Sequence, residues 1–276
     1  MSHPAIAPGR AAVITGGASG IGLAAARRFI EAGMKVCIAD VNAEALEAAR
    51  ASLGANAIAV QTNVAELSQV ERLRDRAYEA FGDVAVLMNN AGTGGGGGPW
   101  SAYAGWQRVL GVNLWGVVNG VHAFAERMIA QGMPCAIVNT GSKQGITNPP
   151  GDTAYNVSKA GVKTLTEGLA HALRNTPGCK VTAHLLVPGF TYTGLTRARL
   201  SEKPPGAWSP EQVVDLLLER IGRGDFYVIC PDNDVTTAMD NARMQWNVGD
   251  IIENRPALSR WHPDFAGQFA DFIKNV

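Results

Sequence analysis

Seven short apolar runs, each followed by a helix-like stretch, constrain the fold of this chain more than any other feature. The runs are apolar throughout rather than alternating, which is typical of strands in a sheet that helices cover on both faces. This strand–helix alternation predicts an α/β fold with a doubly wound parallel sheet of about seven strands. The expected strands are Ala11–Thr15, Lys35–Asp40, Ala57–Gln61, Val84–Asn89, Cys135–Thr140, Val181–Val187 and Phe226–Cys230.

The alternation stops after Cys230. Residues 231–276 contain two expected helices joined by a proline-rich turn, and no expected strand. We interpret this segment as a helical C-terminal appendage packed on the same domain. The 276 residues then form a single domain with its core at about 10–230, because α/β folds of this length are often undivided.

The composition excludes several classes of function. Lysine plus arginine equals aspartate plus glutamate at 24 each, so the net charge is zero and no basic surface for nucleic acid is expected. No apolar stretch reaches the roughly 18 residues of a membrane span, and the start of the chain lacks the layout of a secretory signal. We expect a cytoplasmic protein with no nucleic-acid or membrane partner.

The cysteines and histidines give no sign of a metal site. The four cysteines form no CxxC pair, and the five histidines are scattered without metal-ligand spacing. Three of the cysteines fall within apolar runs, where a free thiol behaves as a small core residue. We therefore expect no metal and assign no histidine a role.

A glycine-rich turn joins the first expected strand to the first expected helix. The segment AAVITGGASGIGLAAARR places Gly16, Gly20 and Gly22 between the two elements. Glycine lacks a Cβ, so it permits a tight turn and lets the backbone approach a pyrophosphate at the positive end of a helix. Turns collect glycine in any case, but the place after a strand and before a helix is the context that a dinucleotide site requires.

Asp40 ends the second expected strand, 18 residues beyond Gly22. A carboxylate there can accept hydrogen bonds from both ribose hydroxyls of an adenosine and repels a 2′-phosphate. Position 41 is Val and position 19 is Ser, so no cation is placed to receive that phosphate. NAD is therefore favoured over NADP. The alternative is that Asp40 caps the next helix.

Tyr155 and Lys159 stand four residues apart in TAYNVSK, which puts them on one face of a helix. A phenol with its ordinary pKa near ~10 is a poor base at neutral pH. An ammonium about 4 Å away, at an effective dielectric of about 20, favours the phenolate by roughly 4 kcal/mol, or about three pKa units. The pair then suits general acid–base catalysis. The alternative is a packed ring beside a solvated amine.

Eight motifs in register give the chain a resemblance to the short-chain dehydrogenase/reductase family, over about residues 10–230. That resemblance implies a Rossmann-type sheet and a nicotinamide cofactor. Position 63 departs from it, because it holds Asn where the family more often has Asp, and position 191 holds Thr where an aliphatic residue is commoner. The motifs are TGGASGIG at 15–22, Asp40, NV at 63–64, NNAG at 89–92, Asn113, Ser142, YNVSK at 155–159 and PGFTYT at 188–193.

The resemblance also implies roles for individual residues. Tyr155 would be the general acid/base, with Ser142 polarising the substrate oxygen, and Lys159 would also hold the nicotinamide ribose. Asn113 would fix a water that connects Lys159 to solvent. The remaining contacts with the cofactor would come from Gly16, Ser19, Gly20, Ile21, Gly22, Asp40 and Val41, from Asn63 and Val64 beside the adenine, from Asn90, Ala91 and Gly92 beneath the ribose, and from Pro188, Gly189, Thr191 and Thr193 at the nicotinamide.

The substrate side is less constrained. Residues 194–208 would form a lid, and the expected pocket walls are Gln144, Phe190, Tyr192 and Trp208. Aromatic walls favour an apolar or aryl substrate. The five glycines Gly94–Gly98 either make a mobile loop or allow something to pass close to their backbone. Our hypothesis is a flexible rim, and the alternative is a slack surface loop.

These features together predict an NAD-dependent oxidoreductase that interconverts a secondary alcohol, apolar or aryl, and its ketone. The alternative is a non-catalytic NAD-binding sensor or regulatory protein on the same fold, since a fold alone does not fix function. Relatives in the family imply a homodimer or homotetramer, paired through the helices expected at about 101–131 and 153–175. The small-molecule alcohol or ketone is the only other partner expected.

Overall fold

The structure is a computed structural model that describes residues 2–194 and 202–274. Its centre is a seven-stranded sheet in the order β3-β2-β1-β4-β5-β6-β7, in which every neighbouring pair is parallel. The expected doubly wound fold is therefore confirmed, with two strands shorter than predicted at their ends. The strands are β1 (Ala11–Thr15), β2 (Lys35–Asp40), β3 (Ala57–Gln61), β4 (Val86–Asn89), β5 (Cys135–Thr140), β6 (Val181–Val187) and β7 (Tyr227–Ile229).

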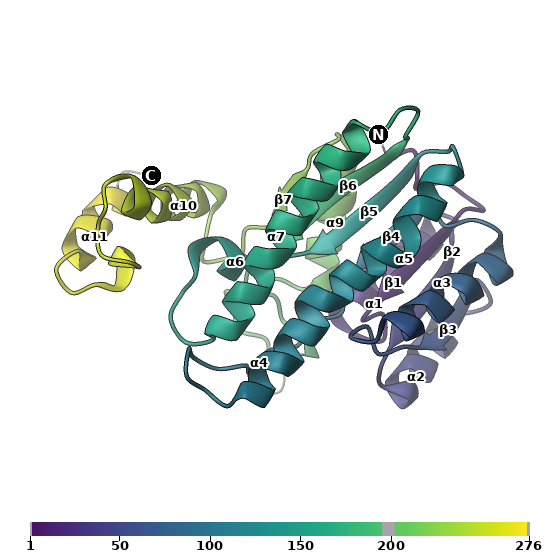
Figure 1. The fold of residues 1–276 in the computed structure, drawn as a ribbon, viewed down its shortest axis with the longest axis horizontal. Coiled ribbons are helices and arrows are strands. Elements are labelled where there is room, and N and C mark those ends of the chain that lie inside the picture. The colour runs from purple at the N-terminus through teal and green to yellow at the C-terminus, as the bar shows by residue number, and fades with distance from the viewer. Residues whose placement is uncertain (1, 195–201, 275–276) are drawn as a thin grey trace.

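Helices cover both faces of the sheet (Figure 1). The residues of α1, α2 and α9 share one buried cluster with the strands, and those of α3, α5 and α7 share another on the opposite face. This two-sided cover explains why the strand runs are apolar throughout. The helices are α1 (Gly20–Glu31), α2 (Ala43–Leu53), α3 (Leu67–Phe81), α4 (Tyr103–Leu110), η1 (Gly111–Trp115), α5 (Gly116–Ala130), α6 (Gln144–Thr147), α7 (Thr153–Arg174) and α9 (Pro210–Gly222).

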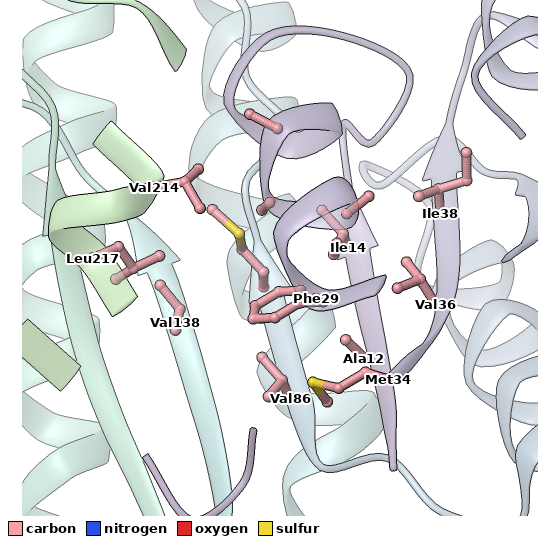
Figure 2. Packing of buried hydrophobic residues seen from close by; sticks show 14 of the residues in the cluster. Ala12, Ile14, Phe29, Met34, Val36, Ile38, Val86, Val138, Val214 and Leu217 are labelled. Atoms are coloured by element: carbon pink, nitrogen blue, oxygen red, sulfur yellow. The ribbon is translucent and has the colours of Figure 1, made fainter. Parts of the chain in front are cut away.

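The first cluster holds α1 tightly against the sheet (Figure 2). Phe29 of α1 is fully buried and lies among Met34, Val86 and Ala12. Burying such side chains stabilises the fold by about 1.5–3 kcal/mol each. Alanines in the segment LAAARR keep the rest of the helix face small, so the helix lies close to β1 and its N-terminus is fixed beyond the end of that strand.

The strand order reverses direction between β1 and β4, and in open parallel sheets a ligand-binding crevice is expected at the carboxyl ends of the strands at such a point. β1 ends at Thr15 and β4 ends at Asn89. The Thr15 Oγ1 atom accepts hydrogen bonds from the backbone N–H groups of Asn90 (3.0 Å) and Ala91 (3.2 Å). The two segments that leave the sheet here are thus tied together, and this edge carries the candidate site.

The C-terminal appendage, residues 231–274 of the described chain, is helical, as predicted. Its elements are α10 (Thr237–Ile252), η2 (Ser259–Trp261) and α11 (Ala266–Lys274), and they stand away from the sheet (Figure 1). The core helix against which α10 packs is α6. Within the arm, the rings of Phe269 and Phe272 each pack on Trp246, with centroids 5.3 Å apart. We call this segment the C-terminal arm.

Across the described residues, every helix is too short or too polar to cross a bilayer.

Candidate active site

The glycine-rich turn is as tight as its sequence requires. Gly16 (φ 64°) and Gly20 (φ 53°) lie in the left-handed region that favours glycine. A Cβ on Gly22 would lie 2.2 Å from the carbonyl oxygen of Gly16, so a side chain there would block the turn. Ile21 packs against the first cluster, and Ser19 stands exposed at the N-cap of α1 without a capping hydrogen bond. Ser19 therefore does not cap the N-terminal N–H groups of α1.

Asp40 lies beside this turn. Its carboxylate accepts hydrogen bonds from the backbone N–H groups of Ala18 (3.3 Å) and Asn42 (3.1 Å). Asn42, not Asp40, is the N-cap of α2, so the capping alternative does not describe the side chain. Val41 is 64% exposed next to it. A carboxylate and an exposed aliphatic side chain thus border the turn where an adenosine would lie.

The floor of the crevice comes from residues 90–92. The Asn90 Nδ2 atom donates to the carbonyl oxygens of Thr15 (3.1 Å) and Gly16 (3.3 Å), which locks it under the turn. A Cβ on Gly16 would lie 2.8 Å from the Cα atom of Ala91. The backbone segments approach so closely that only small residues fit.

Asn63 and Val64 lie at the end of β3. The Asn63 Oδ1 atom accepts from the N–H group of Ala65 (3.1 Å), so this side chain folds back on its own backbone. The carbonyl oxygen of Val64 accepts from Asn119 Nδ2 (2.8 Å). Their assignment to the adenine stays a prediction.

Tyr155 stands in the first turn of α7, whose N-cap is Asp152. The phenol is hydrogen-bonded to the side chain of Ser142, which follows β5. The Lys159 Nζ atom lies 5.8 Å from the centroid of the Tyr155 ring. The structure therefore brings together the three side chains that the sequence placed 13 and four residues apart.

Lys159 is almost completely buried, with 4% of its surface exposed. Its Nζ atom donates to the carbonyl oxygen of Thr140 at 2.8 Å. Burial disfavours the charged form and lowers the pKa of Lys159 to about 8. The ammonium at this position is therefore easier to deprotonate than an ordinary lysine.

The pKa of Tyr155 differs from the sequence expectation. Burial raises it, the hydrogen bond with Ser142 lowers it, and the charge of Asp152 raises it further, with a net shift upward. The expected downward shift assumed an ammonium at about 4 Å in a partly hydrated site. Instead, the same burial that desolvates Lys159 also penalises the phenolate, so the protein alone does not make this phenol acidic.

Asn113 is completely buried in η1, a π-helical turn between α4 and α5. Its Nδ2 atom donates to Thr93 O (2.9 Å) and Ser158 Oγ (3.1 Å), and its Oδ1 atom accepts from Thr93 N (2.7 Å). A Cβ on Gly92 would lie 3.6 Å from Asn113 Oδ1 and 3.8 Å from Lys159 Nζ. Asn113 is thus near Lys159, and its amide joins α7 to the start of the glycine run.

The segment after β6 passes over the glycine-rich turn. A Cβ on Gly20 would lie 3.2 Å from the Cβ atom of Thr193, and one on Gly194 would lie 3.7 Å from Ser19 Oγ. Thr191 is buried, and its Oγ1 atom donates to Gly189 O (3.2 Å). The carbonyl oxygen of Pro188 accepts a hydrogen bond from Lys143 N (3.5 Å), in the loop that carries Ser142. Residues 188–194 therefore border the crevice on the side of Ser142.

The expected lid is held together at its base. Tyr192 N donates to Trp208 O (2.9 Å), and Trp208 N donates to Phe190 O (2.8 Å). The indole of Trp208 packs against the first cluster, whereas Phe190 is 40% exposed and Gln144 is exposed at the start of α6. Residues 195–201 of the lid lie outside the described residues. The assignment of these four side chains to a substrate pocket stays a prediction.

Asp152 is a site residue that the sequence reasoning missed. Its carboxylate accepts from the N–H groups of Gly95 (2.8 Å), Gly96 (3.3 Å) and Gly97 (3.0 Å), and from Tyr155 N (3.2 Å). A Cβ on Gly96 would lie 2.5 Å from the Cβ atom of Ala154. Close backbone approach therefore accounts for glycine here. The acid three residues before Tyr155 was a capping signal that could have been noticed.

Lys143 was also missed. Its Nζ atom lies 2.6 Å from Asp240 Oδ2 and 3.4 Å from Asp232 Oδ2. Both carboxylates belong to the C-terminal arm, so the residue after Ser142 anchors the arm to the loop that carries Ser142. No local sequence signal links residues so far apart in the chain.

The residues of the crevice fit a dinucleotide. The glycine-rich turn leaves the first N–H groups of α1 open for a pyrophosphate, the carboxylate of Asp40 suits a ribose, and Lys159, Tyr155 and Ser142 meet at the other end. Among the described residues, no three His, Cys, Asp or Glu side chains lie close enough together to hold a metal ion.

Comparison with known proteins agrees with this geometry. A family model described as short chain dehydrogenase matches residues 10–204. The 1-deoxy-11-beta-hydroxypentalenate dehydrogenase of Streptomyces exfoliatus is 36% identical over 261 residues, which cover 91% of this chain and 94% of that protein. The cis-4-hydroxycyclohexanecarboxylate dehydrogenase of Sinomonas cyclohexanicum is 37% identical over 222 residues, or 75% of this chain and 87% of that protein.

A solved structure shares the fold over nearly its whole length. The short chain dehydrogenase/reductase from Burkholderia phymatum, solved in complex with NAD, superposes with a TM-score of 0.82 at 37% identity. The match covers 90% of this chain and 96% of that chain.

Proposed function

Since the chain belongs to the short-chain dehydrogenase/reductase family and is an oxidoreductase acting on hydroxyl or ketone groups, we propose that it uses NAD to interconvert a secondary alcohol and its ketone. The observation that carries this proposal is the meeting of Tyr155, Ser142 and Lys159 at the end of the crevice. A binding protein without catalysis would not need a phenol, a hydroxyl and an amine so close together.

Tyr155, Ser142 and Lys159 have separate roles in the proposed reaction. When bound, the nicotinamide ring supplies the hydride acceptor for the carbinol carbon. Tyr155 takes the hydroxyl proton as the carbon–oxygen double bond forms, so the alcohol loses one hydride and one proton to become a ketone. Ser142, which hydrogen-bonds the phenol, is placed to orient the same substrate oxygen. Lys159 favours the phenolate when it is protonated.

The catalytic roles of Asn113 and of the cofactor contacts are part of the proposal. Asn113 holds α7 against the loop that follows Gly92, so it positions Lys159, and its Oδ1 atom has a second lone pair for a water. Asn63, Val64, Asn90, Ala91 and Gly92 would border the adenosine, and Pro188, Gly189, Thr191 and Thr193 would border the nicotinamide.

The choice of NAD over NADP rests on Asp40. Replacing it by Ala removes the ribose acceptor and the charge that repels a 2′-phosphate, so we expect NAD affinity to fall roughly 10- to 100-fold, the range for charge-assisted hydrogen bonds. NADP affinity should rise. The Asp40→Asn variant keeps an acceptor for Ala18 N and loses only the charge, so it should recover NADP binding with a smaller loss of NAD.

Calorimetric titration of NAD and NADP into the wild-type, Asp40→Ala and Asp40→Asn proteins measures these affinities. An unaltered preference in both variants would contradict the proposed ribose contact. If NAD binds and no alcohol or ketone in a broad panel is turned over, the sensor alternative would replace the catalytic proposal.

The substrate class we propose is an apolar cyclic or aryl secondary alcohol. The backbone N–H group of Gln144 donates to Ser142 Oγ at 3.2 Å, and Phe190 and Tyr192 would form aromatic walls of the same pocket. Two of the relatives are named for hydroxylated ring compounds, a hydroxypentalenate and a hydroxycyclohexanecarboxylate. Both observations favour a ring-sized substrate over a sugar.

We also propose a homo-oligomer that pairs through α4, η1, α5 and α7. The helices pack against one another, and their outer face exposes Tyr103 (75%), Trp115 (57%) and Val157 (44%). Large apolar side chains gathered on one exposed helix layer are typical of a subunit interface.

A further inference from the structure

A small cavity lies between the loop that carries Ser142 and Lys143 and the C-terminal arm. It is lined by Lys143 and Ile146 on the core side and by Asp240, Arg243, Met244 and Arg260 on the arm side. The cavity offers about 40 Å³ of space for water-sized molecules, where one water needs roughly 10–15 Å³ by the same measure. Two or three water-sized groups, such as the two oxygens of a carboxylate, fit inside. We call it the seam cavity.

Three cationic side chains border this space, and among the described residues only Lys143 lies within ion-pair distance of a carboxylate. Lys143 pairs with Asp240 and Asp232. Within residues 2–194 and 202–274, neither Arg243 nor Arg260 lies within ion-pair distance of a carboxylate. The Arg243 Nε atom is buried and has no hydrogen-bond partner among those residues. A buried donor without an acceptor is unfavourable unless a ligand or water completes it.

Arg260 is oriented by aromatic rings rather than by an acid. Its guanidinium carbon lies 4.7 Å from the ring centroid of Trp261 and 5.0 Å from that of Phe269. Stacking occupies the face of a guanidinium and leaves its N–H edge available for an anion. Burial and, next, the charge of Arg243 lower the pKa of Arg260, the charge of Asp240 opposes them, and the resulting pKa is about 10. An anion between the two arginines would relieve both effects.

The seam cavity is close to the proposed chemistry. Lys143 directly follows Ser142, and Ile146 belongs to α6, a single helical turn that starts at Gln144. One such turn spans about 5.4 Å. A molecule that binds at both places must extend from Ser142 to the seam cavity, and a ring that carries a hydroxyl on one side and a carboxylate on the other has a comparable length.

We propose that Arg243 and Arg260 bind the carboxylate of a cyclic hydroxy acid or keto acid whose reacting carbon lies at Tyr155. This inference rests on the proposed function, because it names the substrate class of the same site. The apolar walls would hold the ring, and the arginines of the arm would select the acid over neutral alcohols.

The first experiment measures binding without turnover. Cyclohexanecarboxylate and cyclohexanecarboxamide, which have no hydroxyl to oxidise, are titrated calorimetrically into the NADH complex of the full chain. We expect the acid to bind roughly 10- to 100-fold more tightly than the amide, because charge-assisted hydrogen bonds contribute in that range. Arg243→Gln combined with Arg260→Gln should abolish the difference. Arg27→Gln combined with Arg72→Gln, at two exposed arginines of α1 and α3, should leave it intact.

The second experiment measures selectivity. In the protein with both Arg243→Gln and Arg260→Gln, kcat/KM for 4-hydroxycyclohexanecarboxylate, relative to that for 4-hydroxycyclohexanecarboxamide, should fall roughly 10- to 100-fold. The value of kcat/KM for the amide should stay unchanged. Arg260→Lys, which keeps a charge but loses the planar fork, should give an intermediate ratio.

The outcomes separate this inference from the proposed function. Equal binding of acid and amide to the wild-type protein overturns the inference, even if neutral alcohols are oxidised. Binding that needs the arginines, with an unchanged selectivity ratio, shows a site for a free anion and also overturns it. Binding that needs the arginines, with no turnover of any alcohol, overturns the proposed function instead.

Discussion

At the scale of single residues, Tyr155 and Lys159 show that burial acts on both members of a proton-transfer pair. The pKa of the phenol is raised and that of the lysine is lowered, each mainly by desolvation. Spacing in the sequence predicted the contact, but it could not predict the sign of the shift, because burial depends on the packing of α6 and β5 around α7. In the proposed mechanism, the positive charge that lowers the pKa of the phenol comes from the oxidised nicotinamide.

Titration of the phenol tests this directly. The ultraviolet difference between the wild-type protein and Tyr155→Phe isolates the tyrosinate of that residue. We expect a pKa above the ordinary value in the free protein, a lower pKa with NAD⁺, and a pKa near that of the free protein with NADH, whose ring is neutral. Equal values in the three states would contradict the electrostatic part of the account.

At the scale of elements, the glycine run and α7 form one unit through Asp152. The sequence predicted a helix start and a glycine-rich loop separately, but not that the carboxylate at the helix start accepts three N–H groups of the loop. Successive N–H groups around an anion form a concave site of known stability. The flexible-rim hypothesis explained the glycines by their conformational freedom. The structure adds that Gly96 approaches Ala154 closely and that Gly95 and Gly97 have positive φ angles.

Substitution of Asp152 should therefore affect both stability and substrate binding. Asp152→Ala removes the acceptor for the loop and the cap of α7, so we expect unfolding to become easier by about 1–3 kcal/mol, with faster proteolysis within 94–98. KM should rise more than kcat falls. Denaturant unfolding and limited proteolysis check this.

The exposed acid Asp264 supplies the control, since Asp264→Ala should change neither quantity. Cleavage of the glycine run at the same rate in wild-type and Asp152→Ala proteins would mean that the carboxylate does not order the loop.

At the scale of the whole molecule, the covered sheet and the helical nature of the C-terminal arm were predictable, and the packing of the arm was not. A parallel sheet follows from apolar runs that helices must cover on both faces, but the order of its strands was not predicted. The expected place of the site follows from the reversal between β1 and β4. The aromatic residues of the arm indicated packing, but spacing cannot say on what they pack. Phe269 and Phe272 each pack on Trp246, and Ile251 (81%) and Ile252 (77%) remain exposed.

Two exposed apolar surfaces are therefore candidates for the subunit interface, one on the layer of α4, η1, α5 and α7 and one on the arm. We expect Trp115→Glu, on the layer formed by α4, η1, α5 and α7, to convert the oligomer to monomers, because a charge buried in an interface is costly. Ile252→Glu, on the arm, should leave the oligomer intact. Light scattering measures the mass of each variant. Dissociation by Ile252→Glu alone would assign the interface to the arm.

The central claim is that one phenol transfers the substrate proton, and a single-turnover measurement of Tyr155→Phe with bound NAD tests it most directly. The account predicts that the rate of NADH formation falls by roughly 10²–10⁴, with coenzyme affinity nearly unchanged, while the exposed-tyrosine control Tyr103→Phe behaves as wild type. A Tyr155→Phe protein that forms NADH at the wild-type rate would contradict it.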